Sequence, residues 1–229
     1  KGNYFYDETD PNAQFDVSYS NIRVTDMLTK FKVVKAFAPV AEQVNALTTA
    51  KLSLNTKLNN DMSPDLSSIY LAGSLNLENI LIDRLDALKN IDSKLGTNHF
   101  NIKKLGDLLL NFEITDGKLL VSPFEMFIDS SKLSLSGISL LDGRIDYTGL
   151  LSVPSTYIKN QTGSANSILQ GSALQNVQLK PSDYLDIAVK IAGTFNNPEL
   201  KLDLKEVKKG VVQNLKNTVT DEVKQKQEE

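Results

Sequence analysis

The stretch from Leu105 to Pro154 alternates apolar and polar residues along consecutive segments, and it constrains the fold more than any other part of the chain. Leu108, Leu110, Phe112 and Ile114 occupy every second position, which places them on one face of a strand. Asp116-Gly117 and Asp142-Gly143 stand between such segments. Asp-Gly favours a tight hairpin turn, because both residues tolerate positive φ. We therefore predict an antiparallel sheet that is apolar on one face and polar on the other.

The same period of two recurs on both sides of this stretch. Further strands are predicted at 15–19, 50–58, 71–77, 187–193 and 200–204, and the alternation is most regular at 50–58. Helical spacing of apolar residues predicts helices over 25–35 and 83–95, although Asp92 interrupts the second apolar stripe. The predicted fold class is α+β and β-dominated: a curved antiparallel sheet of amphipathic strands, with two or three helices packed on or flanking it. An elongated open groove is one form that such a sheet can take.

The domain boundaries follow from shifts in composition. We predict one β-rich domain over residues 1–204, within which the Ser-, Asn-, Gln- and Gly-rich segment 155–182 is a polar loop. Residues 205–229 are charged, with a thin apolar stripe, and are predicted to form a C-terminal helix or tail.

An internal repeat over about 15–58 and 71–114 is a further hypothesis. Asn21-Ile22-Arg23-Val24 and Asn79-Ile80-Leu81-Ile82 each precede a predicted helix, 58 positions apart. The strand sequences at 51–58 and 107–114 also resemble each other, at an offset of 56. Chance similarity among strands rich in Leu and Asn is the alternative explanation.

Composition and charge limit the function classes. The net charge of −3 gives no reason to expect a nucleic-acid partner, because phosphate binding needs a concentrated basic face. The chain has no cysteine, which excludes disulfides and thiolate metal sites and fits either a reducing cytosol or a thiol-free envelope protein. No run approaches the ~20 apolar residues of a membrane-spanning helix. The start is not a signal peptide and lacks an initiator Met, so we expect a fragment or mature form without its upstream targeting segment.

Catalytic motifs are absent from the sequence. There is no nucleophile elbow, phosphate-binding loop, dinucleotide fingerprint or zinc-protease motif. His99 is the only histidine, and its neighbours predict a surface loop. Acidic residues such as Asp116 and Asp142 fall on turns, where solvation explains them. We predict no enzyme, no catalytic residue, no metal and no cofactor, and a hydrolase that uses His99 is the remaining catalytic alternative.

Several motifs follow one another in a characteristic order. They are Phe37-Ala38-Pro39-Val40-Ala41, Asp61-Met62-Ser63-Pro64-Asp65-Leu66, 112–118, Val121-Ser122-Pro123-Phe124, 133–137, 141–147, 151–154 and 191–198. As an ordered set they resemble the C-terminal region of the AsmA family, large envelope proteins of Gram-negative bacteria related to TamB. The resemblance covers about Phe15 to Leu204, and the family's N-terminal inner-membrane helix has no counterpart here.

The resemblance implies an elongated periplasmic β structure with a hydrophobic groove that conducts or shields phospholipid acyl chains in outer-membrane biogenesis. It also implies inner-membrane anchoring through a missing N-terminal segment, and other envelope proteins as partners. Acyl chains need no directional contacts, so aliphatic residues suffice, at ~0.8 kcal/mol for each CH₂ removed from water. The groove candidates are Leu52, Leu54, Leu58, Leu71, Leu75, Leu77, Leu108, Leu110, Phe112, Leu133 and Leu135.

A closed core predicts the same alternation, with the helices at 25–35 and 83–95 covering the apolar face. The protein would then be a structural or protein-interaction module of the envelope that binds no lipid. An open apolar groove would distinguish the first function from the second.

Overall fold

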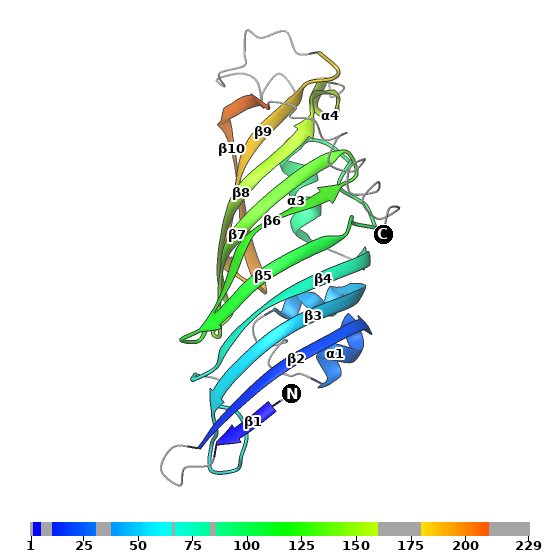
Figure 1. Cartoon of the computed structure of the whole chain (residues 1–229). Coiled ribbons are helices and arrows are strands. Elements are labelled where there is room, and N and C mark those ends of the chain that lie inside the picture. The colour runs from blue at the N-terminus through cyan, green and yellow to red at the C-terminus, as the bar shows by residue number, and fades with distance from the viewer. Residues whose placement is uncertain are drawn as a thin grey trace.

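The chain folds into one curved, open antiparallel sheet. The computed structural model describes residues 2–5, 11–30, 38–65, 67–82, 86–159 and 180–210. Its ten strands lie side by side in chain order, from β1 at one edge to β10 at the other, and these two edges do not pair with each other (Figure 1). The predicted fold class is confirmed.

The elements have the following bounds. The strands are β1 (Gly2–Phe5), β2 (Asn12–Arg23), β3 (Val44–Lys57), β4 (Tyr70–Ile82), β5 (Leu108–Thr115), β6 (Lys118–Ile128), β7 (Ser131–Leu140), β8 (Arg144–Pro154), β9 (Tyr184–Thr194) and β10 (Asn197–Gly210). The helices are α1 (Val24–Lys30), the 3-10 helix η1 (Pro39–Gln43), α3 (Asp86–Leu95) and α4 (Ser155–Lys159).

Both predicted Asp-Gly turns connect neighbouring strands. Asp116 and Gly117 have φ of 49° and 68°, as a two-residue primed turn between β5 and β6 requires. The loop between β7 and β8 is one residue longer, and only Gly143 adopts positive φ, at 87°. The amide of Gly143 donates to the Leu140 carbonyl (N–O 2.9 Å), which closes this loop.

Glycines on the inner side of the sheet accompany its curvature. A Cβ on Gly149 would lie 1.8 Å from the carbonyl oxygen of Ser134, and one on Gly137 would lie 2.3 Å from that of Asp146. Neighbouring strands therefore approach more closely here than any side chain allows. Bulges also interrupt the strand pairing, for example between Val121 and Phe124 of β6. Glycine positions and bulges of this kind let a sheet curl.

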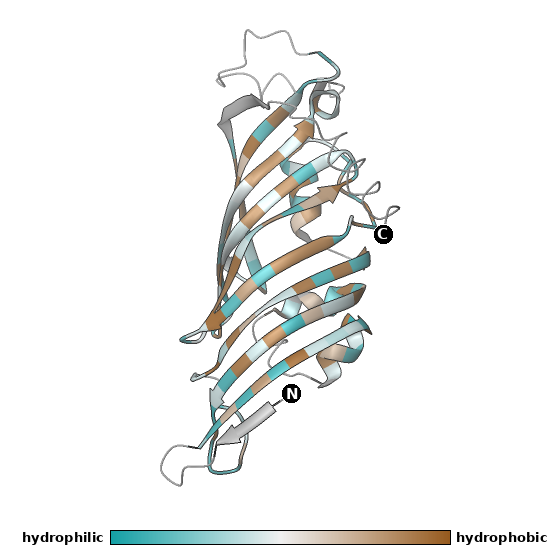
Figure 2. Cartoon of the chain, in the orientation of Figure 1, coloured by the Kyte–Doolittle hydropathy of each residue, from teal (hydrophilic) through white to brown (hydrophobic). Residues whose placement is uncertain are grey.

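The strand register gathers the apolar residues on one face, which we call the inner face. Residues directly opposite each other in an antiparallel pair share a face. One cross-strand row joins Leu54, Leu71, Ile114 and Leu119, and another pairs Leu77 with Leu108. Bands of hydrophobic and hydrophilic residues accordingly alternate along the strands (Figure 2).

The helices lie on this inner face, near one end of the strands (Figure 1). Leu88, Ile91 and Leu95 of α3 are buried in one apolar cluster with residues of β4 to β9. Ile158 of α4 and the fully buried Phe100 belong to the same cluster. Because α3 also contacts β10, the sheet curls around this helix.

Asp92 has a different role from the one predicted. The sequence suggested that it weakens the apolar stripe of the helix, but its side chain is buried and closes the helix end. Its carboxylate accepts hydrogen bonds from the Thr97 hydroxyl (2.7 Å) and the Phe100 amide (3.1 Å). Gly96, with φ of 64°, reverses the chain between the helix and the two donors. A buried carboxylate is tolerated here because it has these donors.

The prediction of a helix from residue 205 onward was wrong for its first part. Residues 205–210 continue β10, and after a bulge Lys208 and Lys209 lie opposite Asp186 and Leu185. Ladder hydrogen bonds to β9 override the local helical preference of this charged segment. Residues 211–229 lie outside the described part. In the predicted polar loop, α4 occupies 155–159, and residues 160–179 again lie outside the described part.

The β2–β3 and β4–β5 pairs share one register. Phe15 lies opposite Leu54, and Gly73 lies opposite Phe112, so both partners move by 58 residues. Asn21 and Asn79, also 58 apart, both have positive φ, at 58° and 53°. Each donates its amide to a side chain 28 residues later, to Thr49 (3.4 Å) and to Asp107 (3.3 Å). The shift is thus 58 along both strands rather than 56 in the second, and it supports the repeat hypothesis.

Candidate functional site

The inner face of the sheet divides into three zones along the strand direction. At the helix end, α1, α3 and α4 pack on it. At the opposite, turn end, Ile69, Leu71, Ile114 and Leu119 form a small buried cluster of their own. Between them runs a zone that we call the middle belt.

The middle belt consists of half-buried apolar side chains from β2–β6 and β8–β10. Its members are Val17, Leu52, Leu54, Leu75, Leu110, Phe112, Val121, Phe124, Tyr147, Ile191 and Leu202. All of them except Val17 and Tyr147 pack against the buried cluster on one side or the other, and all keep part of their surface exposed. The other face carries most of the polar side chains, including the ion pair of Lys132 with Glu125 (2.9 Å), together with exposed apolar residues such as Leu109, Leu120 and Leu150. The belt is therefore an apolar strip across the curve of the sheet.

The eleven groove candidates all project from the apolar side of the alternation, but they differ in exposure. Five are buried: Leu71, Leu77, Leu108, Leu133 and Leu135. Six are half-buried: Leu52, Leu54, Leu58, Leu75, Leu110 and Phe112. Leu58 lies just beyond β3, in an isolated bridge with Pro64. Five of the half-buried residues thus belong to the belt, whereas the buried ones lie in the clusters at its two sides.

The list of groove candidates left out the belt residues of β2, β6 and β8–β10, although the predicted strand at 187–193 contains Ile191. The bulge at Ser122-Pro123 shifts the alternation of β6, so that Phe124 and Met126 face inward with Val121. Tyr147 shares a hydrogen bond with the Ser139 hydroxyl (O–O 2.8 Å), and its burial raises the pKa of the phenol. A pattern search that allowed one slip at Ser-Pro would have found Phe124, because Pro marks bulges and edges in strands.

His99 is exposed in the loop after α3, as the sequence predicted. Its ring stacks on Tyr157 of α4, with centroids 3.6 Å apart and planes 11° from parallel. The Tyr157 hydroxyl donates to the Asp129 carboxylate, so this cluster connects the loop after α3, α4 and the β6–β7 turn. Among the described residues, no group of three or more His, Asp or Glu side chains is placed to hold a metal ion.

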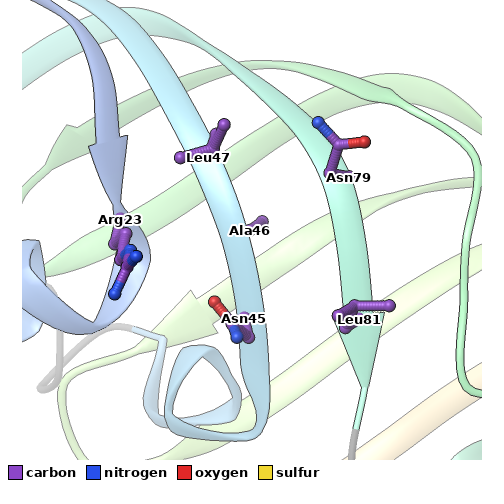
Figure 3. Close-up of a pocket in the computed structure, with 6 residues that line it drawn as sticks. All are labelled: Arg23, Asn45, Ala46, Leu47, Asn79 and Leu81. Atoms are coloured by element: carbon purple, nitrogen blue, oxygen red, sulfur yellow. The ribbon is translucent and has the colours of Figure 1, made fainter.

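Two open depressions lie beside the helix end of β2–β4. The first, of about 320 Å³, is lined by Arg23, Asn45, Ala46, Leu47, Asn79 and Leu81 (Figure 3). The second, of about 390 Å³, shares Asn45 and Leu81 and includes Lys103. Arg23 and Leu47 lie opposite each other on the outer face, so the first depression is separate from the middle belt.

Comparisons with known proteins give no further guide. No protein-family model, curated protein or solved structure matches this chain. Within the described part of the chain, no helix has both the length and the apolar character needed to cross a membrane.

Proposed function

We propose that this protein binds phospholipid acyl chains along the middle belt and has no enzymatic activity. The observation that carries the proposal is the series of half-buried apolar side chains across the inner face, from Val17 on β2 to Leu202 on β10, interrupted only at β7, where Gly137 lies between Val121 and Tyr147. Such contiguous apolar surface on a soluble fold usually marks a binding site.

The chemistry of the belt suits a hydrocarbon ligand. It is almost wholly aliphatic or phenyl, apart from the Tyr147 hydroxyl, which bonds to Ser139. A palmitoyl chain fully removed from water would contribute on the order of 10 kcal/mol before the entropic costs of binding are subtracted. An acyl chain on the open belt keeps part of its surface in water and so gains less binding free energy. This favours a chain that binds reversibly and slides rather than one held permanently.

The resemblance to the AsmA family extends this proposal to the cell. The protein would act in the periplasm, in lipid transport for outer-membrane biogenesis, with other envelope proteins as partners. As the resemblance implies, an inner-membrane anchor would precede this region.

A second function is favoured by the helix end. There, Ile91, Leu95 and Phe100 are almost completely buried, as in a closed core. If the belt only completes this core, the protein is a structural or protein-interaction module of the envelope without lipid binding.

Native mass spectrometry of the purified protein, with lipid extraction from the same sample, separates these functions. Leu110→Gln and Leu109→Gln form a matched pair, because both residues lie on β5 but face opposite sides. Leu110 belongs to the belt, whereas Leu109 is 57% exposed on the outer face. Acyl binding predicts co-purifying phospholipid that is reduced several-fold in Leu110→Gln and unchanged in Leu109→Gln.

Circular dichroism must first show that both variants remain folded. The proposal fails if the wild-type protein carries no phospholipid and takes up none of a fluorescent phospholipid. It also fails if the two substitutions reduce binding equally, because the inner face would then have no special role.

A further inference from the structure

The apolar floor of the middle belt continues beneath α3. Leu75 and Leu110 of the belt pack directly against the helix-end cluster. Along β5, Leu110 is half-buried, whereas Leu108, on the same face two residues away, is buried within that cluster. The inner face is thus one continuous apolar surface, and α3 covers part of it.

The contacts of α3 with the sheet are apolar. Leu88, Ile91 and Leu95 face the strands, whereas Lys89 and Ser93 on the other side of the helix are exposed. Among the described residues, the side-chain hydrogen bonds of α3 are made with the loop that follows it, where the Thr97 hydroxyl and the Phe100 amide donate to the Asp92 carboxylate. Non-directional contacts of this kind can be replaced by another apolar group of similar size.

The loop after α3 is joined to the sheet by main-chain hydrogen bonds as well as by apolar contacts. Phe100 is 1% exposed, and His99 stacks on Tyr157. Main-chain hydrogen bonds tie the loop to β4, from the Ile82 amide to the Lys103 carbonyl (2.9 Å) and from the Leu105 amide to the Ile80 carbonyl (3.0 Å). The C-terminal side of α3 therefore has a fixed point about which the helix can move.

We propose a second, occluded acyl-binding site beneath α3, for which α3 is a displaceable plug. The site is floored by Leu77, Leu108, Leu133, Leu151 and Ile187, which are all buried in the present structure. An acyl chain that extends from the belt takes the place of Leu88, Ile91 and Leu95, and α3 pivots about the loop at 97–100. This inference rests on the proposed acyl binding at the belt.

Hydrogen–deuterium exchange of the full chain, with and without lysophosphatidylglycerol below its micelle concentration, tests the plug directly. We expect faster exchange in peptides covering 86–95 when the lipid is bound, with peptides covering 97–108 unchanged. Native mass spectrometry of the same sample shows whether lipid is bound. If lipid is bound and 86–95 keeps its protection, the plug is wrong and acyl binding at the belt stands. If no lipid binds, both proposals are overturned.

A pair of helix variants provides a second test with the same probe. Ile91→Ala removes apolar contacts that hold α3 against the sheet, whereas Ser93→Ala changes the exposed side of the helix. A ligand that binds only a minor open state has an apparent affinity proportional to the fraction of protein in that state. Ile91→Ala should increase this fraction, so the variant is expected to bind the lipid at least threefold more tightly. Ser93→Ala is expected to match the wild type. Weaker binding by a folded Ile91→Ala protein would show that α3 is a fixed wall of the site and would overturn the plug.

Discussion

The helix end and the middle belt are built from the same strands and the same alternation, yet one is a core and the other is a partly open surface. Leu108 and Leu110 have the same residue type, strand and face, and only Leu108 is buried. The difference arises from α3 and Phe100, which cover one zone and leave the next uncovered. The alternation thus determines on which face of a strand a residue lies. Whether that residue is part of the core or of a partly open surface depends on which other elements pack over it.

The largest difference between the two zones is expected for a matched pair of phenylalanines. Phe100→Ala, at the helix end, should lower the free energy of unfolding by about 3–5 kcal/mol, because a fully buried ring leaves a cavity. Phe112→Ala, in the belt, should cost roughly half as much, because its ring is already partly in water. Urea denaturation monitored by circular dichroism gives both values. Equal losses would mean that the belt is as much a core as the helix end.

The curvature that separates the inner face from the outer face depends on glycine. Gly149→Ala should destabilise the fold by about 1–3 kcal/mol, since its Cβ would overlap the Ser134 carbonyl. Gly106→Ala is the control, because its Cβ would meet Phe127 at an ordinary 3.5 Å. A Gly149→Ala protein as stable as the control would contradict the close strand approach.

The two halves of the repeat can be compared at Asn21 and Asn79, which lie at the bulges of the β2–β3 and β3–β4 pairs. Asn21→Ala and Asn79→Ala each place an ordinary side chain at positive φ and should each cost about 1 kcal/mol. Because the two positions have nearly the same φ and both variants keep the main-chain amide that donates to Thr49 or Asp107, the losses should agree within a few tenths of a kcal/mol. Thermal denaturation of both variants would measure this, and a large loss at only one bulge would weaken the repeat hypothesis.

The smallest effect is expected from the belt hydroxyl at high pH. Burial raises the pKa of Tyr147 above its ordinary 10.0, so folding favours the neutral phenol. Its contribution to stability is full below pH 10 and is lost as the pH rises through the folded-state pKa. Tyr147→Phe should therefore reduce the loss of stability between pH 9 and 11. An unchanged pH profile would place the phenol in water.

The sequence predicted the sheet, its apolar face and both Asp-Gly turns, because each depends on local backbone chemistry and on a period of two. It could not separate Leu108 from Leu110, since the cover that distinguishes them comes from α3, packed against several strands. Phe124 escaped the prediction because the Ser122-Pro123 bulge shifts the alternation. Residues 205–210 were assigned to a helix because the continuation of the β9–β10 pairing past the bulge between Asp203 and Lys208 cannot be inferred from local propensity. Asp92 was misjudged because its donors, Thr97 and Phe100, lie beyond the helix.

Photo-crosslinking along β5 tests acyl binding at the belt most directly. A benzophenone side chain replaces Leu109 in one protein and Leu110 in another, and each is irradiated with vesicles of phosphatidylglycerol and phosphatidylethanolamine that carry a detectable acyl chain. Acyl binding at the belt predicts strong crosslinking from position 110 and little from position 109. Equal crosslinking from both positions, or none from position 110 in a folded protein, would contradict acyl binding at the middle belt.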